Sequence, residues 1–157
     1  MQLDALIALG ELALRAEDRL LARERFTRAA RLAERWCRPV SRGRARAMLA
    51  LMAMNERQLE PAEAEARRAA EALALHPRDQ AWSTIGLVRA TCAAVARQAP
   101  AARQWWSLAR ERGLGQRIEP LHKHALVTLC GAMEGLELED MEPAVWEALA
   151  VLTASQP

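Results

Sequence analysis

The side chains of this chain best suited to catalysis or metal binding are three histidines and three cysteines. His122 and His124 lie two residues apart, so on a helix they would point about 200° apart and could not hold a metal ion from one face. His76 stands alone before Pro77. We therefore expect the histidines to be solvent-exposed or to line a binding groove, with no catalytic or metal-binding role.

The cysteines are too few and too scattered for a disulfide framework or a zinc site. Cys37, Cys92 and Cys130 are odd in number, far apart and outside any CxxC pair. The chain also has no glycine-rich phosphate loop and no GxSxG motif, and spacing pairs no cysteine with a histidine. We expect a non-enzymatic protein without cofactor or metal, whose cysteines serve as small core residues in a reducing cytoplasm.

Composition indicates an all-helical protein. Alanine, leucine, arginine and glutamate dominate the 157 residues, with no tyrosine, one phenylalanine and few β-branched residues. Asp4 and Glu11 stand where a secretory signal would carry positive charge and then an apolar core, and no apolar run approaches the roughly 18 residues of a membrane span. The sequence predicts one soluble cytoplasmic domain over 1–157, with no membrane contact.

Small and large residues recur every 40 positions, which is the strongest pattern in the sequence. One column is the small-large-small triplet Ala22, Phe26 and Ala29, and a second is a pair of small residues three apart, Gly10 and Ala13. The later copies are Ala62, Ala66 and Ala69; Ala102, Trp106 and Ala109; a weaker Glu142, Trp146 and Leu149; and, in the second column, Ala50 and Ala53, Ala90 and Ala93, and Cys130 and Met133.

Each copy of this pattern predicts a helical hairpin. Small residues three apart share a helix face on which another backbone can approach closely, and the triplet forms the stripe of a helix that packs there. Neither helix can cover its apolar face alone, so successive hairpins should stack into a curved solenoid. Trp82, Ile85 and Gly86 sit one turn early, which predicts a longer first helix in the third hairpin. Prolines help to place the expected helices at 3–16, 18–37, 42–56, 60–75, 79–97, 100–112, 120–133 and 142–154, in approximate repeats 1–40, 41–78, 79–118 and 119–157.

The repeat resembles the tetratricopeptide repeat. Trp82, Ile85 and Gly86 match its first-helix signature, and ALALHP, ending at Pro77, is similar to its close. The period of 40 exceeds the usual 34 and resembles the longer repeats of kinesin light chains and of the sensor regions of large bacterial transcription activators such as the maltose activator; HEAT-like repeats are an alternative. The resemblance implies a right-handed α-solenoid of about four hairpins and eight helices. It is strongest in the first repeat, where the matching residues are Leu6, Leu9, Gly10, Ala22, Phe26 and Ala29.

The same resemblance implies a protein-interaction module, an adaptor or chaperone, with a concave groove lined by the first helices. The groove would be mixed and rather apolar, which suits a helix or an extended peptide with apolar anchors. Only Arg15 and Arg44 could serve in a basic clamp for a C-terminal carboxylate, so that specificity is not expected. The implied groove residues are Asp4, Ile7, Glu11, Leu14, Arg15, Arg44, Ala47, Leu51, Met54, Asn55, Thr84, Leu87, Thr91, His124, Val127 and Gly131.

Two other functions stay open. One is an effector-sensing segment of a larger bacterial transcriptional regulator. The other is nucleic-acid binding, because eleven arginines face four acidic residues between Arg15 and Arg46, and Trp36 could stack on a base. Arginines at helical spacing more often form a solvated face, and Glu24 and Arg28 make a favourable i, i+4 pair. We favour the solvated face.

The C-terminal part is acidic, and its last helix, expected at 142–154, is apolar on almost every side. A helix of that kind is normally buried, and a repeat array needs a polar terminal cap. We therefore expect this helix to mediate self-association, to be covered by a partner, or to contact more of a longer chain.

Two adjacent tryptophans need different roles. Trp106 shares the column of Phe26 and is assigned to the core. Trp105 shares a column with Arg25 and Glu65, which the first two repeats would leave to solvent. We expect Trp105 to pack against the next hairpin or the 113–121 link, with a partner contact on the outer surface as the alternative.

Overall fold

The computed structural model describes residues 2–114 and 119–154. Over these residues it is all-helical, with eight α-helices, a short 3₁₀ helix and no strand. Each expected helix is present, and its ends differ from the expected ones by three residues or fewer. The helices are α1 (Gln2–Arg15), α2 (Arg19–Arg35), α3 (Pro39–Asn55), α4 (Leu59–Ala72), α5 (Ala81–Val95), α6 (Ala99–Glu111), α7 (Lys123–Met133) and α8 (Glu142–Ala154), with the 3₁₀ helix η2 (Pro120–His122) before α7.

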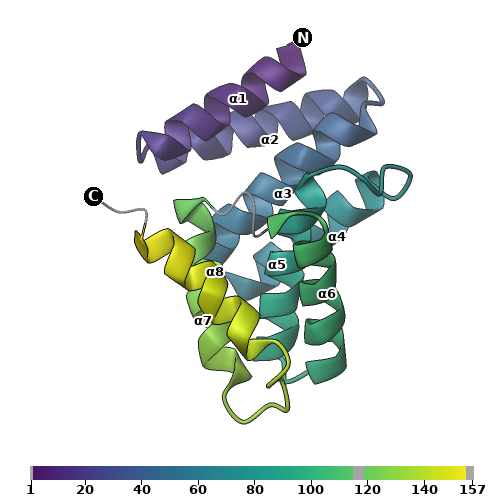
Figure 1. The fold of residues 1–157 in the computed structure, drawn as a ribbon. Helices are drawn as coiled ribbons and strands as arrows, with labels where there is room; N and C mark the ends of the chain where they lie inside the picture. The colour runs from purple at the N-terminus through teal and green to yellow at the C-terminus, as the bar shows by residue number, and fades with distance from the viewer. Residues whose placement is uncertain (1, 115–118, 155–157) are drawn as a thin grey trace.

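Successive helices pair as antiparallel hairpins (Figure 1). The pairs α1 with α2, α3 with α4 and α5 with α6 pack closely, and α2 also packs on α3 and α4 on α5. Their cores contain the predicted columns, because Phe26, Ala66 and Trp106 are all buried. In the first hairpin a Cβ atom on Gly10 would lie 2.7 Å from Cε1 of Phe26, so only glycine allows this approach of α1 and α2.

The turns between helices repeat every 20 residues. Glu17, Cys37, Arg57 and Arg97 have positive φ, and in each turn the next residue's N–H donates to a carbonyl five residues back, as in a Schellman cap. These bonds are 2.8–2.9 Å long. Position 77, the remaining one between Glu17 and Arg97 in this series, is a proline, whose ring forbids positive φ. The link between α4 and α5 consequently takes a different path.

That link corrects the prediction of a longer first helix in the third hairpin. Backbone bonds from His76 to Leu73 and from Asp79 to His76 form turns where the expected helix would begin. The side chain of Asp79 accepts a 3.0 Å bond from the N–H of Ala81, and α5 starts there. At 15 residues, α5 is shorter than α3, which has 17.

The fourth hairpin departs from the 40-residue columns. Trp146 is 56% exposed, whereas Val145 is fully buried. The buried stripe of α8 is therefore one residue earlier than predicted, because the segment before it folds inward and buries Leu138 and Met141. The expectation that α8 is apolar on almost every side is correct for its sequence, but one side of the helix is exposed.

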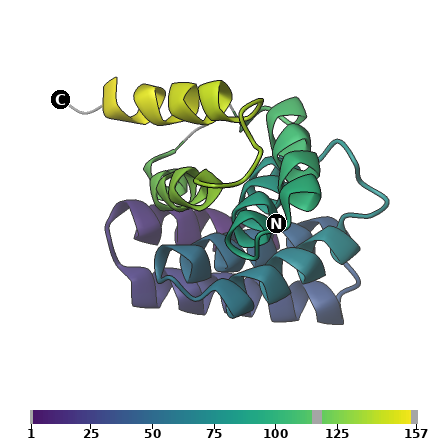
Figure 2. The same cartoon turned by 90° about the horizontal axis from the view of Figure 1, so that it is seen from below.

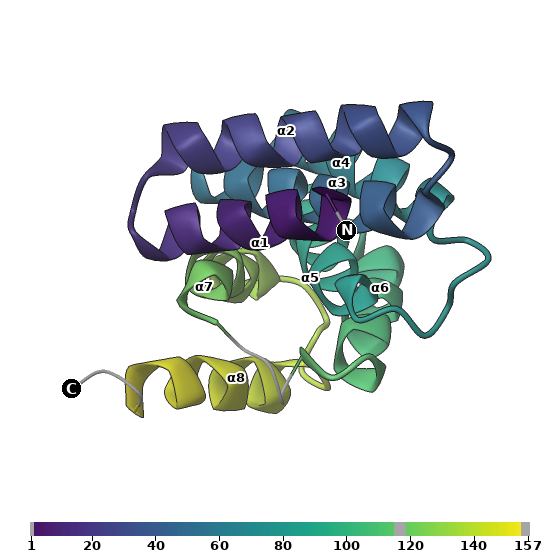
Figure 3. The same cartoon turned by 90° about the horizontal axis from the view of Figure 1, so that it is seen from above.

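The position of α7 differs from a simple continuation of the stack. It packs against α5 and α3, and η2 packs against α3, so this part lies over the first helices of the two preceding hairpins. Figure 2 shows α7 between α8 and the rest of the molecule. Figure 3 shows α2 and α8 at opposite edges, with α1 and α7 between them.

Candidate functional site

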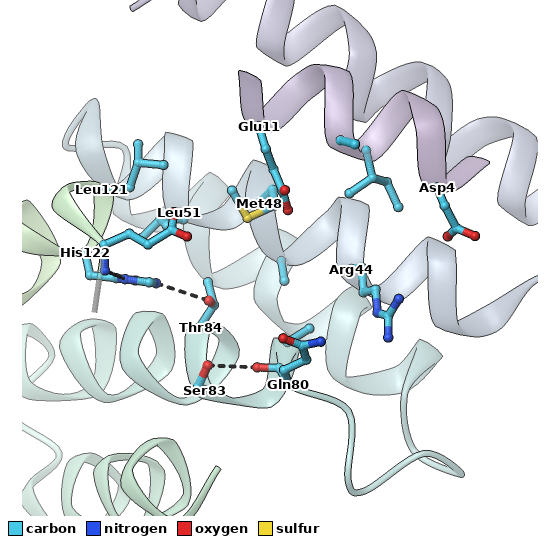
Figure 4. Close-up of a pocket in the computed structure, with 15 residues that line it drawn as sticks. Asp4, Glu11, Arg44, Met48, Leu51, Gln80, Ser83, Thr84, Leu121 and His122 are labelled. Carbon is cyan, nitrogen blue, oxygen red and sulfur yellow. Dashed lines mark hydrogen bonds between the residues drawn. The ribbon is translucent and has the colours of Figure 1, made fainter. Parts of the chain in front are cut away.

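A cavity of about 370 Å³ lies between α1, α3, the start of α5 and segment 119–122 (Figure 4). Helices α1 and α3 each contribute residues at i, i+3, i+4 and i+7, which is the spacing of one helix face. The wall residues are Asp4, Ile7, Ala8 and Glu11 of α1; Arg44, Ala47, Met48 and Leu51 of α3; Gln80, Ala81, Ser83 and Thr84; and Glu119, Leu121 and His122.

Seven of the predicted groove residues line this cavity. They come from three different helices, and the tetratricopeptide resemblance, carried along the 40-residue period, had implied one groove for them. They are Asp4, Ile7, Glu11, Arg44, Ala47, Leu51 and Thr84.

The other predicted groove residues do not line it. Leu14, Met54, Leu87 and Thr91 are buried. Met54 and Leu87 share a core cluster with residues of α7, and the hydroxyl of Thr91 donates to the carbonyl of Leu87 at 2.9 Å and lies 3.3 Å from that of Ala125. The groove therefore does not extend to Met54, Leu87 and Thr91, because α7 packs against that part, and Leu14 is buried instead in a cluster of α1, α2 and α3. Arg15, Asn55, His124, Val127 and Gly131 lie outside the cavity lining.

His122 forms part of the cavity wall. Its Nδ1 accepts a 3.0 Å hydrogen bond from the backbone N–H of Glu119, so the ring proton sits on Nε2, which lies 3.3 Å from the hydroxyl of Thr84. Burial lowers the pKa of His122 to about 4, so the imidazole is neutral at pH 7. This histidine ties segment 119–122 to α5.

The lining of the cavity also includes acidic groups. Burial raises the pKa of Glu11, and the nearby charge of Glu119 raises it further, against the opposing effects of Arg15 and Arg44. Arg15 lies 3.8 Å from Glu119, with both side chains half exposed or more. Two carboxylates thus face one space, which favours a positively charged group between them.

Arg44, the basic residue of the cavity wall, is turned toward a different partner. Its Nε and Nη2 lie 3.0 Å and 2.9 Å from Oδ2 of Asp79, whose side chain is 6% exposed. A bidentate pair of this kind holds the guanidinium in place. Arg44 still lowers the pKa of Glu11, but its effect is the smallest of the four on that carboxyl.

Several wall residues escaped the sequence analysis. Glu119, Leu121 and His122 belong to a stretch treated as a link, and only their packing onto α3 and α5 makes them part of a site. Met48 and Ala8 neighbour predicted positions on the same helix faces, and a wider stripe would have included them.

Trp105 is partly buried and packs against the main core cluster. The guanidinium carbon of Arg89 lies 4.0 Å from the ring centroid, a cation–π contact within the same hairpin. Its column is not left to solvent either: Glu65 is bound by Arg46 at 2.8 Å and Val145 is buried. Arg89 therefore covers part of the Trp105 ring.

The arginine-rich region is partly neutralised by the fold. Arg23 pairs with Glu56, Arg46 with Glu65, and Arg42 lies 3.7 Å from Glu34. These pairs reduce the charge that region 15–46 offers to a polyanion.

The three cysteines differ in their exposure to solvent. Cys37 is exposed in a turn, which corrects its expected place in the core. Cys92 is partly buried, and burial raises the pKa of its thiol to about 12. Cys130 is also partly buried, and burial raises its pKa as well.

Comparisons with models of known protein families, with curated proteins and with solved structures find no match for this chain. In the described part of the chain, no group of three or more histidine, cysteine or acidic side chains is placed to hold a metal ion. Within the same residues, the helices are too short or too polar to cross a membrane. Functional inference therefore rests on the geometry of the cavity.

Proposed function

We propose that this chain is a non-enzymatic protein-interaction module, an adaptor or chaperone of the cytoplasm, with the architecture of a right-handed tetratricopeptide-like α-solenoid. Its ligand is a peptide segment that places an apolar side chain beside a lysine or arginine. The segment binds in the cavity between α1, α3 and α5.

One observation carries this proposal: the cavity combines an apolar floor with acidic walls. Met48 and Leu121 are partly exposed and offer apolar surface, and Leu51 in the same lining is buried. Glu11 and Glu119 both line the space, and the pKa of Glu11 is raised chiefly by burial and further by repulsion from the charge of Glu119. A bound cation would relieve that repulsion while an adjacent apolar side chain covers the floor.

The hydrogen bonds of His122 support binding rather than catalysis. Both ring nitrogens of His122 are engaged, by Glu119 and Thr84, and the imidazole stays neutral down to acidic pH. A general base must be free to take a proton from a substrate. His122 instead holds segment 119–122 against α5 and so fixes the shape of the cavity wall.

The test uses a pair of substitutions on α1. Ala8 lines the cavity and Ala5 is exposed outside its lining, so Ala8→Trp fills the space whereas Ala5→Trp adds the same bulk elsewhere. Peptides selected from a random library on the wild-type chain should bind Ala5→Trp unchanged and lose at least tenfold in affinity for Ala8→Trp, measured by calorimetry. They should also be enriched in Lys or Arg beside an apolar residue. Equal affinity for the two variants would exclude the cavity as the binding site.

A second function, sensing of a small effector as part of a larger regulator, is favoured by the size of the cavity. At about 370 Å³ it falls within the roughly 300–1,000 Å³ of small-molecule sites. The same chemistry would then select an amphiphilic amine. Thermal stabilisation by such amines in Ala5→Trp but not in Ala8→Trp, with no peptide selected, would decide for this alternative.

A further inference from the structure

The outer face of α8 combines an exposed tryptophan with uncompensated acids. Trp146 is 56% exposed, and its Nε1 donates a 3.4 Å hydrogen bond to Glu142. Glu139 and Glu147 are exposed nearby, and within the described residues no ion pair engages these three carboxylates. A large aromatic ring framed by like charges is costly to leave in water and typical of a contact surface.

The outer face of α2 has the complementary character. Leu20, 83% exposed, lies with Leu32 in a shallow groove whose other walls include Arg28 and Arg31. Among the described residues neither arginine has an ion pair or hydrogen bond. Residues 20, 24, 28 and 31 lie at i, i+4, i+8 and i+11, so the groove runs along one exposed stripe of the helix. The only acid in its lining is Glu24.

These two faces lie at opposite edges of the molecule (Figure 3). They cannot meet within one chain, but they can meet between two. A contact between different surfaces of identical chains is heterologous, and unless it closes into a ring it leaves one free surface of each kind at the ends.

We propose that the occupant of the α2 groove is a second copy of this chain, docked head to tail through α8. Trp146 of one copy enters the apolar groove at Leu20 and Leu32 of the next. Its flanking carboxylates face Arg28 and Arg31. The contact is independent of the cavity between α1, α3 and α5, so it goes beyond the proposed function and stands without it.

The charges select this pairing over a symmetric one. Two α8 faces brought together would oppose acid to acid, and two α2 faces would oppose arginine to arginine, whereas α8 on α2 joins opposite signs. Because these charges are exposed, their attraction is screened by salt. Association should therefore weaken as ionic strength rises.

Sedimentation of the full chain over a range of concentrations tests the proposal with two complementary variants. Arg28→Glu with Arg31→Glu blocks the α2 face, and Trp146→Ser blocks the α8 face; all three side chains are exposed, so the fold is retained. The wild-type mass should rise with concentration without a plateau at a dimer, and should fall in 0.5 M salt. Each variant alone should be a monomer.

The decisive sample is the mixture of the two variants. Each retains the face that the other lacks, so the mixture should form a 1:1 complex of twice the monomer mass and nothing larger. The control, Arg67→Glu with Arg78→Glu, makes the same change of charge at exposed positions outside the groove and should assemble as the wild type does. A wild type that stays monomeric, a dimer that survives Arg28→Glu with Arg31→Glu, or a mixture that remains monomeric would each overturn the proposal.

Discussion

A Cβ atom on Gly86 would lie 2.8 Å from the carbonyl oxygen of Trp105 and 2.9 Å from the backbone nitrogen of Ala109. Helices α5 and α6 therefore touch through their backbones, which cannot swing aside as a side chain can. Gly131, on α7, has nothing within 4 Å of the same atom.

Alanine at these two glycines should have opposite effects. Gly86→Ala should lower the free energy of unfolding by roughly 1–3 kcal/mol, because α5 and α6 must separate. Gly131→Ala should raise it by about 0.5–1 kcal/mol through helix propensity alone. Urea denaturation followed by circular dichroism measures both, and equal changes in the two variants would contradict the close backbone contact.

The positive-φ turns predict a second pair of opposite effects. Arg57 has a φ of 60°, a strained conformation for a residue with a Cβ, and no bonds hold its side chain within the described structure. Arg57→Gly should therefore stabilise the chain by about 0.5–1 kcal/mol. Arg67→Gly, the same substitution inside α4, should destabilise it by about 1 kcal/mol. Thermal unfolding at fixed pH separates the two, and a loss of stability in Arg57→Gly would refute the turn geometry.

His122 makes stability depend on pH. Its pKa is about 4 in the folded chain against 6.5 as the ordinary value, so between these pH values the unfolded chain binds a proton that the folded chain does not. Stability should fall as the pH drops from 6.5 to 4, by up to about 3 kcal/mol from this residue. Below pH 4 this contribution should be constant.

His122→Gln isolates that contribution. The variant should be less stable than the wild type at pH 7 but should lose less stability between pH 6.5 and 4. His76→Gln, at an exposed histidine, serves as the control and should keep the wild-type pH dependence. Parallel curves for wild type and His122→Gln would show that the imidazole is not buried.

The two tryptophans that share a 40-residue column should respond differently to truncation. Trp106 is 3% exposed, and Trp106→Ala should cost roughly 3–5 kcal/mol. Trp146→Ala should cost under about 1 kcal/mol when measured at concentrations where the chain is monomeric, because the ring lies mostly in solvent. A large cost at Trp146 would restore the predicted register of α8.

Local patterns in the sequence were enough to predict the helices. Alanine columns mark helix contacts wherever the backbones approach, and prolines with polar residues mark the turns, so α1 to α6 follow from the chain itself. The resemblance to the tetratricopeptide repeat, carried along the 40-residue period, predicted one groove for Ile7, Ala47 and Thr84, which line one cavity. These are short-range rules, and they hold where each helix packs on its neighbour.

Long-range packing explains what the sequence did not predict. Nothing local in the stretch around His122 indicates that it folds back onto Thr84, 38 residues earlier in the chain. The register of α8 slipped by one residue because the segment before it buries Leu138 and Met141, which a fixed period cannot foresee. Arg89 over Trp105 depends on a long side chain reaching across two helices, and spacing alone does not encode that contact.

Asp79 joins two hairpins with one carboxylate. Its Oδ1 accepts from the N–H of Ala81 at the start of α5, and its Oδ2 binds Arg44 on α3. In mechanical terms the residue is a clasp: a force that pulls the third hairpin from the second loads this side chain directly. At this joint the ion pair shares the load with the pair of Arg89 and Glu63 and with the apolar packing of Leu73 and Ile85.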